Sequence, residues 1–180
     1  MIKKASEIIG LPVICLDEGC KSMEVKDLIY SHSKYQIEAL VIQDGKFFQD
    51  RKAINFQDVI KFENNSIIIQ NKDYIRSFRT NPSIFHEPSI NENLLGIDVN
   101  SEGGSNIGMV QDISIDTLSG KIEYLIITEG IFDDLIEGRP LMPMDNNNFT
   151  MNQNTLIISS NTTDKIINNT GGLKRILSME

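Results

Sequence analysis

The sequence predicts a mainly β protein: two tandem small antiparallel β-barrels, joined by an ordered linker and followed by one or two short helices at the C-terminus. Three observations support this fold class. The apolar runs are short, rich in Ile and Val, and bounded by Gly, Asn, Asp and Pro, which is typical of strands. No run in the sequence shows the long 3.6-residue apolar period of an amphipathic helix. The same order of features also occurs twice along the chain.

The internal duplication sets the domain organisation. The run 37–45 aligns with the run 122–130 without a gap, at an offset of 85 residues. Fixed offsets of this kind indicate repeated structural units. We therefore expect a first barrel-like repeat over residues 1–75, a linker over residues 76–91, and a second repeat with a helical tail over residues 92–180.

Glycines and exposed edges determine how each repeat is expected to close. Asp44-Gly45 and the segment 118–121 are expected to form hairpin turns, because glycine reaches positive φ without a Cβ clash. Short strands leave unpaired edges unless the sheet wraps on itself. Each repeat is therefore predicted to be a closed or nearly closed antiparallel sheet.

The linker and the tail follow from proline, aromatic and capping residues. Pro82 and Pro88 limit regular structure, while three nearby aromatic residues predict that the linker packs on a repeat. In the tail, the segment 162–164 can cap a short helix that extends through Ile167. Gly171-Gly172 would end that helix.

Composition excludes some classes of function. The 180 residues carry 17 Lys and Arg against 25 Asp and Glu, a net charge of −8, which argues against general nucleic-acid binding. No stretch approaches the roughly 18 apolar residues of a membrane span, so no membrane insertion is expected and the predicted location is the cytoplasm. Cys15 and Cys20 are expected to pack as small apolar side chains. With His32 they would make only three zinc ligands, so no metal and no cofactor is predicted.

Matched glycines and aspartates in the two copies resemble the PRC-barrel family, which unites the cytoplasmic domain of the photosynthetic reaction centre H subunit with the C-terminal domain of the ribosome maturation factor RimM. The motif residues are Gly10, Asp27 and Gly45 in the first copy, and Gly96, Gly108, Asp112, Gly120 and Gly130 in the second. They are interpreted as scaffold residues. The first copy departs from the pattern: Met23 stands at the place of Gly108 and Tyr35 at the place of Gly120, so its hairpins are expected to turn by other means.

Two loops at corresponding places are the candidate partner-binding sites. The loop of the second copy interleaves apolar and acidic residues, whereas that of the first copy is aromatic and basic. The candidate residues are Phe132, Asp133, Asp134, Leu135 and Glu137 in the second copy, and Phe47, Phe48 and Arg51 in the first. An aromatic anchor with charges that steer a partner is typical of a protein-docking surface.

Other chemistry is poorly supported by the spacing of the residues. Asp98, Asn100 and Glu102 begin like a calcium loop, but Met109 occupies the position that requires a bidentate Glu. His32 and His86 lack an assignable partner that would orient a catalytic base.

The sequence therefore predicts a non-enzymatic protein-interaction module of the bacterial cytoplasm, with an unknown protein partner and with homo-oligomerisation left open. Two alternatives stay open. One is a ribosome- or RNA-associated factor, by analogy with RimM. The other is a small-molecule or metal-dependent enzyme in a cleft between the barrels, which would use His32, His86 or the acidic cluster.

Overall fold

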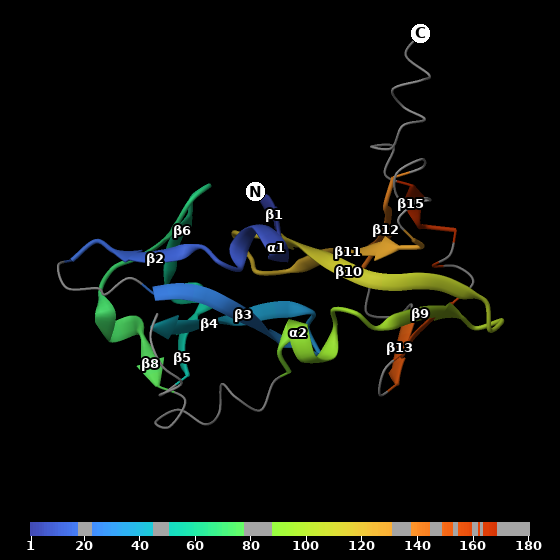
Figure 1. Cartoon of the computed structure of the whole chain (residues 1–180), viewed down its shortest axis with the longest axis horizontal. Helices are drawn as coiled ribbons and strands as arrows, with labels where there is room; N and C mark the ends of the chain where they lie inside the picture. Colours follow the sequence, from blue (N-terminus) through green and yellow to red (C-terminus); the bar gives the residue numbers. More distant parts are fainter. Residues whose placement is uncertain are drawn as a thin grey trace, which may run out of the picture. The chain divides into compact units, whose positions relative to one another are not determined.

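A computed structural model describes residues 1–17, 23–44, 51–77, 88–130, 138–144, 149–152, 155–159, 162 and 164–168 (Figure 1). The structure is mainly β and contains two sheets. The chain divides into two compact units. The first unit is Met1–Glu92 with Ile115–Lys121, and the second unit is Asn93–Ser114 with Ile122–Glu180. The first unit is therefore discontinuous in sequence.

The first sheet has the strand order β6-β7-β2-β3-β4-β5-β8. Its strands are β2 (Pro12–Cys15), β3 (Met23–Ser31), β4 (Gln36–Asp44), β5 (Lys52–Asn55), β6 (Val59–Phe62), β7 (Ile67–Ile69) and β8 (Arg76–Ser77). Strand β1 (Ile2–Lys4) and helix α1 (Ala5–Ile8) precede them, and the 3-10 turns η1 (Phe56–Asp58) and η2 (Lys72–Tyr74) precede β6 and β8.

The second sheet has the strand order β13-β14-β9-β10-β11-β12-β15, and β1 also pairs with β10. Its strands are β9 (Asp98–Ser101), β10 (Asn106–Asp116), β11 (Ile122–Thr128), β12 (Pro140–Pro143), β13 (Phe149–Asn152), β14 (Thr155–Ile158) and β15 (Ile167–Asn168). Helix α2 (Ile90–Asn93) precedes them. Within the described part of the chain, no helix is long and apolar enough to cross a membrane.

The strands follow the same path in both sheets, but the prediction of purely antiparallel sheets is wrong. Among the described strands, β2 pairs with β7 and β9 pairs with β14 in parallel. A tight hairpin makes its two strands antiparallel. After β5, however, η1 leads the chain to β6 at the other end of the strand order, and the next strand, β7, then lies beside β2 and parallel to it. Among the described strands, no recorded pair joins the two ends of either path. Closure into barrels therefore stays a prediction.

Two short strands correct the predicted linker and tail. Ile167 pairs with Leu141 in a β ladder, so the predicted helix through Ile167 is wrong at that residue. The β-branched Ile167 satisfies its backbone on the edge of β12 rather than in a helical turn. Arg76 and Ser77 pair with β5 and therefore belong to the first sheet, although they were expected in the linker. At the other end of the predicted linker, Pro88 accepts a hydrogen bond from the Tyr30 amide at 3.2 Å.

Aliphatic side chains form the core of each unit. Fully buried residues include Val25, Leu28, Leu40, Ile42, Ile54, Ile67 and Ile69 in the first unit, and Val99, Val110, Ile113, Leu125, Ile127, Leu156 and Ile158 in the second. On β3, β4 and β5 the opposite face is buried too, through the cluster Ile29, Ala39, Val41 and Ala53. These three strands are covered on both faces, which explains why they read as continuous apolar runs.

Candidate protein-interaction site

Gly10 and Gly96 make equivalent turns ahead of the two sheets. Gly10 has φ +91° and donates its N–H to the Val25 carbonyl at 2.8 Å, while Gly96 has φ +81° and donates to Val110 at 2.7 Å. A Cβ built at either glycine would meet nothing within 4 Å. Glycine is therefore needed here for its left-handed conformation and not for close packing.

Asp27 and Asp112 also play matching roles. Each carboxylate accepts a 2.8 Å hydrogen bond from the next backbone amide, that of Leu28 or Ile113. Asp27 follows a shift in the register of β3 with β4, so its side chain satisfies an amide beside a β-bulge. Asp112 is only 8% exposed. These carboxylates are used in hydrogen bonds to their own backbone, which is a scaffold role.

Tyr35 corrects the expectation that the first copy turns by other means than the second. Tyr35 has φ +49°, and Gly120 has φ +77°. The Tyr35 amide donates to the Ser31 carbonyl at 2.8 Å, just as the Gly120 amide donates to Asp116 at 2.7 Å. The two hairpins therefore share one turn geometry. A tyrosine accepts the left-handed backbone here, although that conformation is costly for most side chains.

Gly108 lies against the end of β11. A Cβ on Gly108 would lie 2.5 Å from the Thr128 carbonyl oxygen and 2.7 Å from the Ile127 Cγ2 atom. β11 ends at Thr128, and the loop 129–137 begins there. Gly108 therefore lets the end of β11 approach β10 closely. The corresponding residue of the first copy, Met23, is 5% exposed and pairs with Asp44 at the end of β4.

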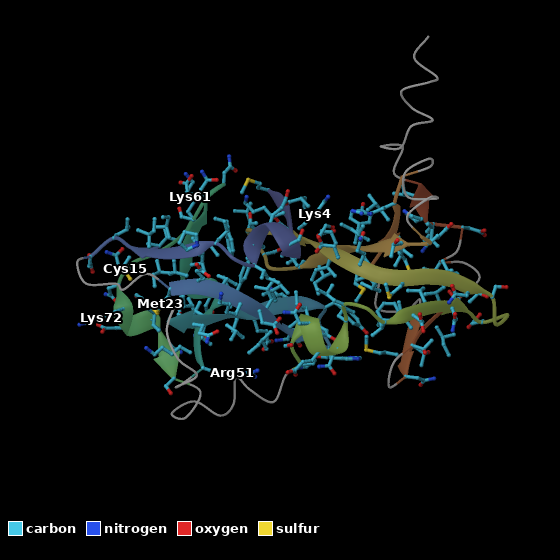
Figure 2. The ribbon with its side chains drawn as sticks, in the orientation of Figure 1. Lys4, Cys15, Met23, Arg51, Lys61 and Lys72 are labelled. Carbon is cyan, nitrogen blue, oxygen red and sulfur yellow. The ribbon has the colours of Figure 1, made fainter. Side chains whose placement is uncertain are left out.

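The candidate loops connect corresponding strands, β4 to β5 in the first sheet and β11 to β12 in the second. Arg51 is exposed immediately before β5 and is labelled in Figure 2. Gly130 has φ +144° at the start of the acidic loop. The other candidates lie outside the described residues: Phe47, Phe48, Phe132, Asp133, Asp134, Leu135 and Glu137, together with the motif residue Gly45.

The turn between β10 and β11 has a defined electrostatic environment. The Ser119 hydroxyl donates to an Asp116 carboxylate oxygen at 2.8 Å, and the Leu118 amide donates to the other at 3.2 Å. These hydrogen bonds, that of Ser119 first, hold the pKa of Asp116 below its usual value of 3.8. Asp116 is therefore ionised at neutral pH and caps its own turn.

The residues considered for metal binding or catalysis have structural surroundings. Asp98 and Asn100 lie in β9, which pairs with both β10 and β14, so they are not in a helix-flanked calcium loop. His32 stacks on Tyr30 with ring centroids 6.4 Å apart and lies 5.8 Å from Tyr35. Within the described ranges, no three His, Cys, Asp or Glu side chains are grouped as metal ligands. His86 lies outside these ranges.

Cys15 differs from its predicted state. It is disulfide-bonded at the end of β2, although the sequence suggested a free cysteine, and Cys20 is the only other cysteine of the sequence. Disulfides persist in oxidising compartments and are rare in the cytosol. The cytoplasmic location therefore stays a prediction, and a count of thiols in the protein isolated without reductant would test it.

The second sheet, with the residues just before it, corresponds to a known domain type. Its path runs from β9 to β15, is preceded by the glycine turn at Gly96, and contains the buried Asp112. Residues 91–170 match the PRC-barrel domain family. The PRC-barrel match spans every strand of this path and less than half of the 180 residues. No curated protein matches the chain significantly.

Proposed function

We propose that the chain is a non-enzymatic protein-interaction module built from two PRC-barrel-like repeats, and that it binds a protein partner through the loops that follow β4 and β11. Its proposed setting is the bacterial cytoplasm.

The observation that carries this proposal is the agreement between the two sheets in strand path and in turn-forming residues. Gly10 corresponds to Gly96, Asp27 to Asp112, and the turn at Tyr35 to the turn at Gly120. Each shared position maintains the backbone of its own sheet. The shared residues thus favour a duplicated scaffold, and function is expected where the two copies differ.

The copies differ most in charge and in the two loops. Residues 1–90 contain 12 basic and 12 acidic side chains, whereas residues 91–180 contain 5 and 13. The second loop combines Phe132 and Leu135 with the carboxylates of Asp133, Asp134 and Glu137. Aromatic side chains commonly supply the binding energy of an interface, while the charges around them set association rate and specificity. A basic protein surface with an apolar pocket fits this loop.

The test is quantitative co-purification of the tagged protein from its native lysate in the presence of nuclease. Wild type is compared with the double variant Phe132→Ala/Asp134→Lys and with the matched variant Phe47→Ala/Arg51→Glu in the first loop. A protein that is lost with both variants supports docking on both loops, and one that is lost with a single variant limits docking to the loop which that variant changes. Equal recovery with all three proteins contradicts the proposal. A partner that wild type retains in a parallel sample without nuclease, but loses with nuclease, would favour an RNA-associated role instead.

A further inference from the structure

We propose that the outer face of β6, β7 and β2 in the first unit is a self-association surface that docks a second copy of this chain. We call it the aliphatic face and define it by Ile14, Leu16, Ile60 and Ile68. This inference goes beyond the proposed function and does not use the loops on which that function rests.

The strand register brings these side chains together. Ile14 of β2 pairs with Ile68 of β7, which also pairs with Lys61 of β6. Ile60 precedes Lys61 and lies where the register of β6 with β7 shifts. The Leu16 amide continues the parallel pairing by donating to the Ile69 carbonyl at 3.0 Å. Because side chains alternate along a strand, these residues lie on the face opposite the buried core residues of β2 and β7.

The exposure of this face is unusual for a sheet. Ile14 is 46% exposed, Leu16 60% and Ile60 53%. An antiparallel or mixed sheet that faces water on one side normally carries polar residues there. Figure 2 labels Lys61 on β6 and Cys15 on β2, two of the three strands that carry this face.

The second unit shows that the fold itself does not require these apolar residues. Asn100 follows the buried Val99 in β9 and pairs with Ile157, just as Ile14 follows Val13 in β2 and pairs with Ile68. Glu102 stands where the first unit has Leu16. At the positions of Ile14 and Leu16 the second unit is thus polar, whereas Ile68 has an aliphatic counterpart in Ile157.

The charges around the aliphatic face favour a second copy as its occupant. On β3, Lys26 and Glu24 form an ion pair at 2.8 Å, and on β6, Lys61 pairs with Glu63. Each rim therefore carries one charge of each sign and can complement the other rim across a two-fold interface. The net charge of residues 1–90 is zero, so two copies of a protein with net charge −8 meet here without net repulsion between the docking halves.

The size of the face sets the strength of the association. Its exposed aliphatic surface is on the order of 300 Å², which is comparable to the largest apolar patch of an ordinary monomer. A stable dimer buries about 800 Å² on each partner. We therefore expect a dimer that forms with rising concentration and dissociates on dilution.

The first test is sedimentation equilibrium of the full chain from about 5 µM to 1 mM, a range chosen to bracket weak association. Wild type should shift from monomer to dimer. Ile14→Asn copies the residue that the second unit carries at the equivalent position, so it should fold normally and weaken the dimer at least tenfold. Leu118→Ser removes an apolar side chain that is 86% exposed in the β10–β11 turn and is not part of the aliphatic face, so it should leave the dimer unchanged.

A charge exchange tests the complementarity of the rims. Lys61→Glu places two carboxylates on the β6 rim and should weaken the dimer, and the further change Glu24→Lys should restore it. Circular dichroism and melting temperature confirm that each variant is folded.

A monomer at every concentration, an equal loss of dimer with Leu118→Ser, or no restoration of the dimer by the second charge change would each overturn the proposal. The proposal would also be overturned if wild type were monomeric and Ile14→Asn abolished the binding of a different protein, since the face would then bind that protein. Phe132→Ala/Asp134→Lys should leave the dimer intact, which separates this proposal from the proposed function.

Discussion

At the level of single residues, the surroundings of Gly108 leave no room for a side chain. Gly108 has φ +140°, which strains any side chain, and we expect Gly108→Ala to cost about 1–3 kcal/mol beyond that strain, because its Cβ would overlap the Thr128 carbonyl and force β11 away from β10. For a chain of this size the melting temperature should fall by roughly 2–4 °C per kcal/mol. Thermal unfolding followed by circular dichroism measures the change.

Gly104 provides the matched control for this substitution. It also has a positive φ, +82°, but an added Cβ would meet nothing within 4 Å. Gly104→Ala should therefore cost only the backbone strain of about 1–2 kcal/mol for a left-handed residue. Equal melting temperatures for the two variants would show that the contact with Thr128 does not constrain Gly108.

At the level of elements, the β10–β11 turn should make stability depend on pH. The Asp116 carboxyl has a lower pKa in the folded protein than in the unfolded chain, where the usual value of 3.8 applies. The unfolded chain therefore binds the proton more tightly, so this contribution to stability is present above the usual value and is lost as the pH falls through the lower, folded value. The stabilising contribution of Asp116 to the turn should begin to decrease once the pH falls below about 4.

The measurement is an NMR titration of the Asp116 carboxyl carbon. Ser119→Ala removes the largest cause of the low pKa and should move the midpoint upward, toward the usual value. Ser33→Ala lies in the corresponding β3–β4 turn and should leave the midpoint unchanged. If the Ser119→Ala midpoint coincides with that of wild type, the hydroxyl does not stabilise the carboxylate.

The elements also show how far the sequence alone could lead. The aligned runs 37–45 and 122–130 contain all of β11 and all of β4 except its first residue, because both runs hold continuous aliphatic residues between turn residues. The parallel neighbours of β2 and β9 could not be predicted, since residue alternation does not say which distant strand supplies the partner. Tyr35 was missed as a left-handed turn residue because that conformation is rare for a tyrosine.

The candidate sites were predictable to different extents. The candidate loops were proposed from composition, because Phe132 and its acidic neighbours differ so clearly from Phe47 and Arg51, and they stay a prediction. The aliphatic face was missed because Ile14 and Ile68 stand in aliphatic runs that read as core strands. When both faces of a strand are apolar, sequence periodicity cannot assign one of them to solvent.

At the level of the whole molecule, the first unit should be incomplete without residues 115–121. The Ile37 amide donates to the Gly120 carbonyl at 2.8 Å, and the Gln36 side chain donates to the Ser119 carbonyl. A fragment of residues 1–92 lacks both acceptors. We expect its Ile37 amide to exchange with solvent much faster than in the full chain, because the exchange of an amide reports the opening of its hydrogen bond.

The Gly10 amide serves as an internal reference in the same hydrogen-exchange experiment. Its acceptor, the Val25 carbonyl, is present in the fragment, so Gly10 should keep more of its protection than Ile37. Equal protection factors for Ile37 in the fragment and in the full chain would show that the turn contributes nothing to the first unit.

The discontinuity of the first unit also has a consequence during synthesis. A nascent chain that has released residues 1–92 still lacks the turn 115–121 and must wait until residue 121 has emerged. At about 5–20 residues per second, those 29 residues take roughly 1.5–6 s to add. Through that interval the backbone donor of Ile37 in the β3–β4 hairpin lacks its acceptor, and part of the Phe56 ring in η1 lacks its neighbour Gly120. Mistakes in the assembly of this protein should therefore begin at the hairpin, before the second unit has been made.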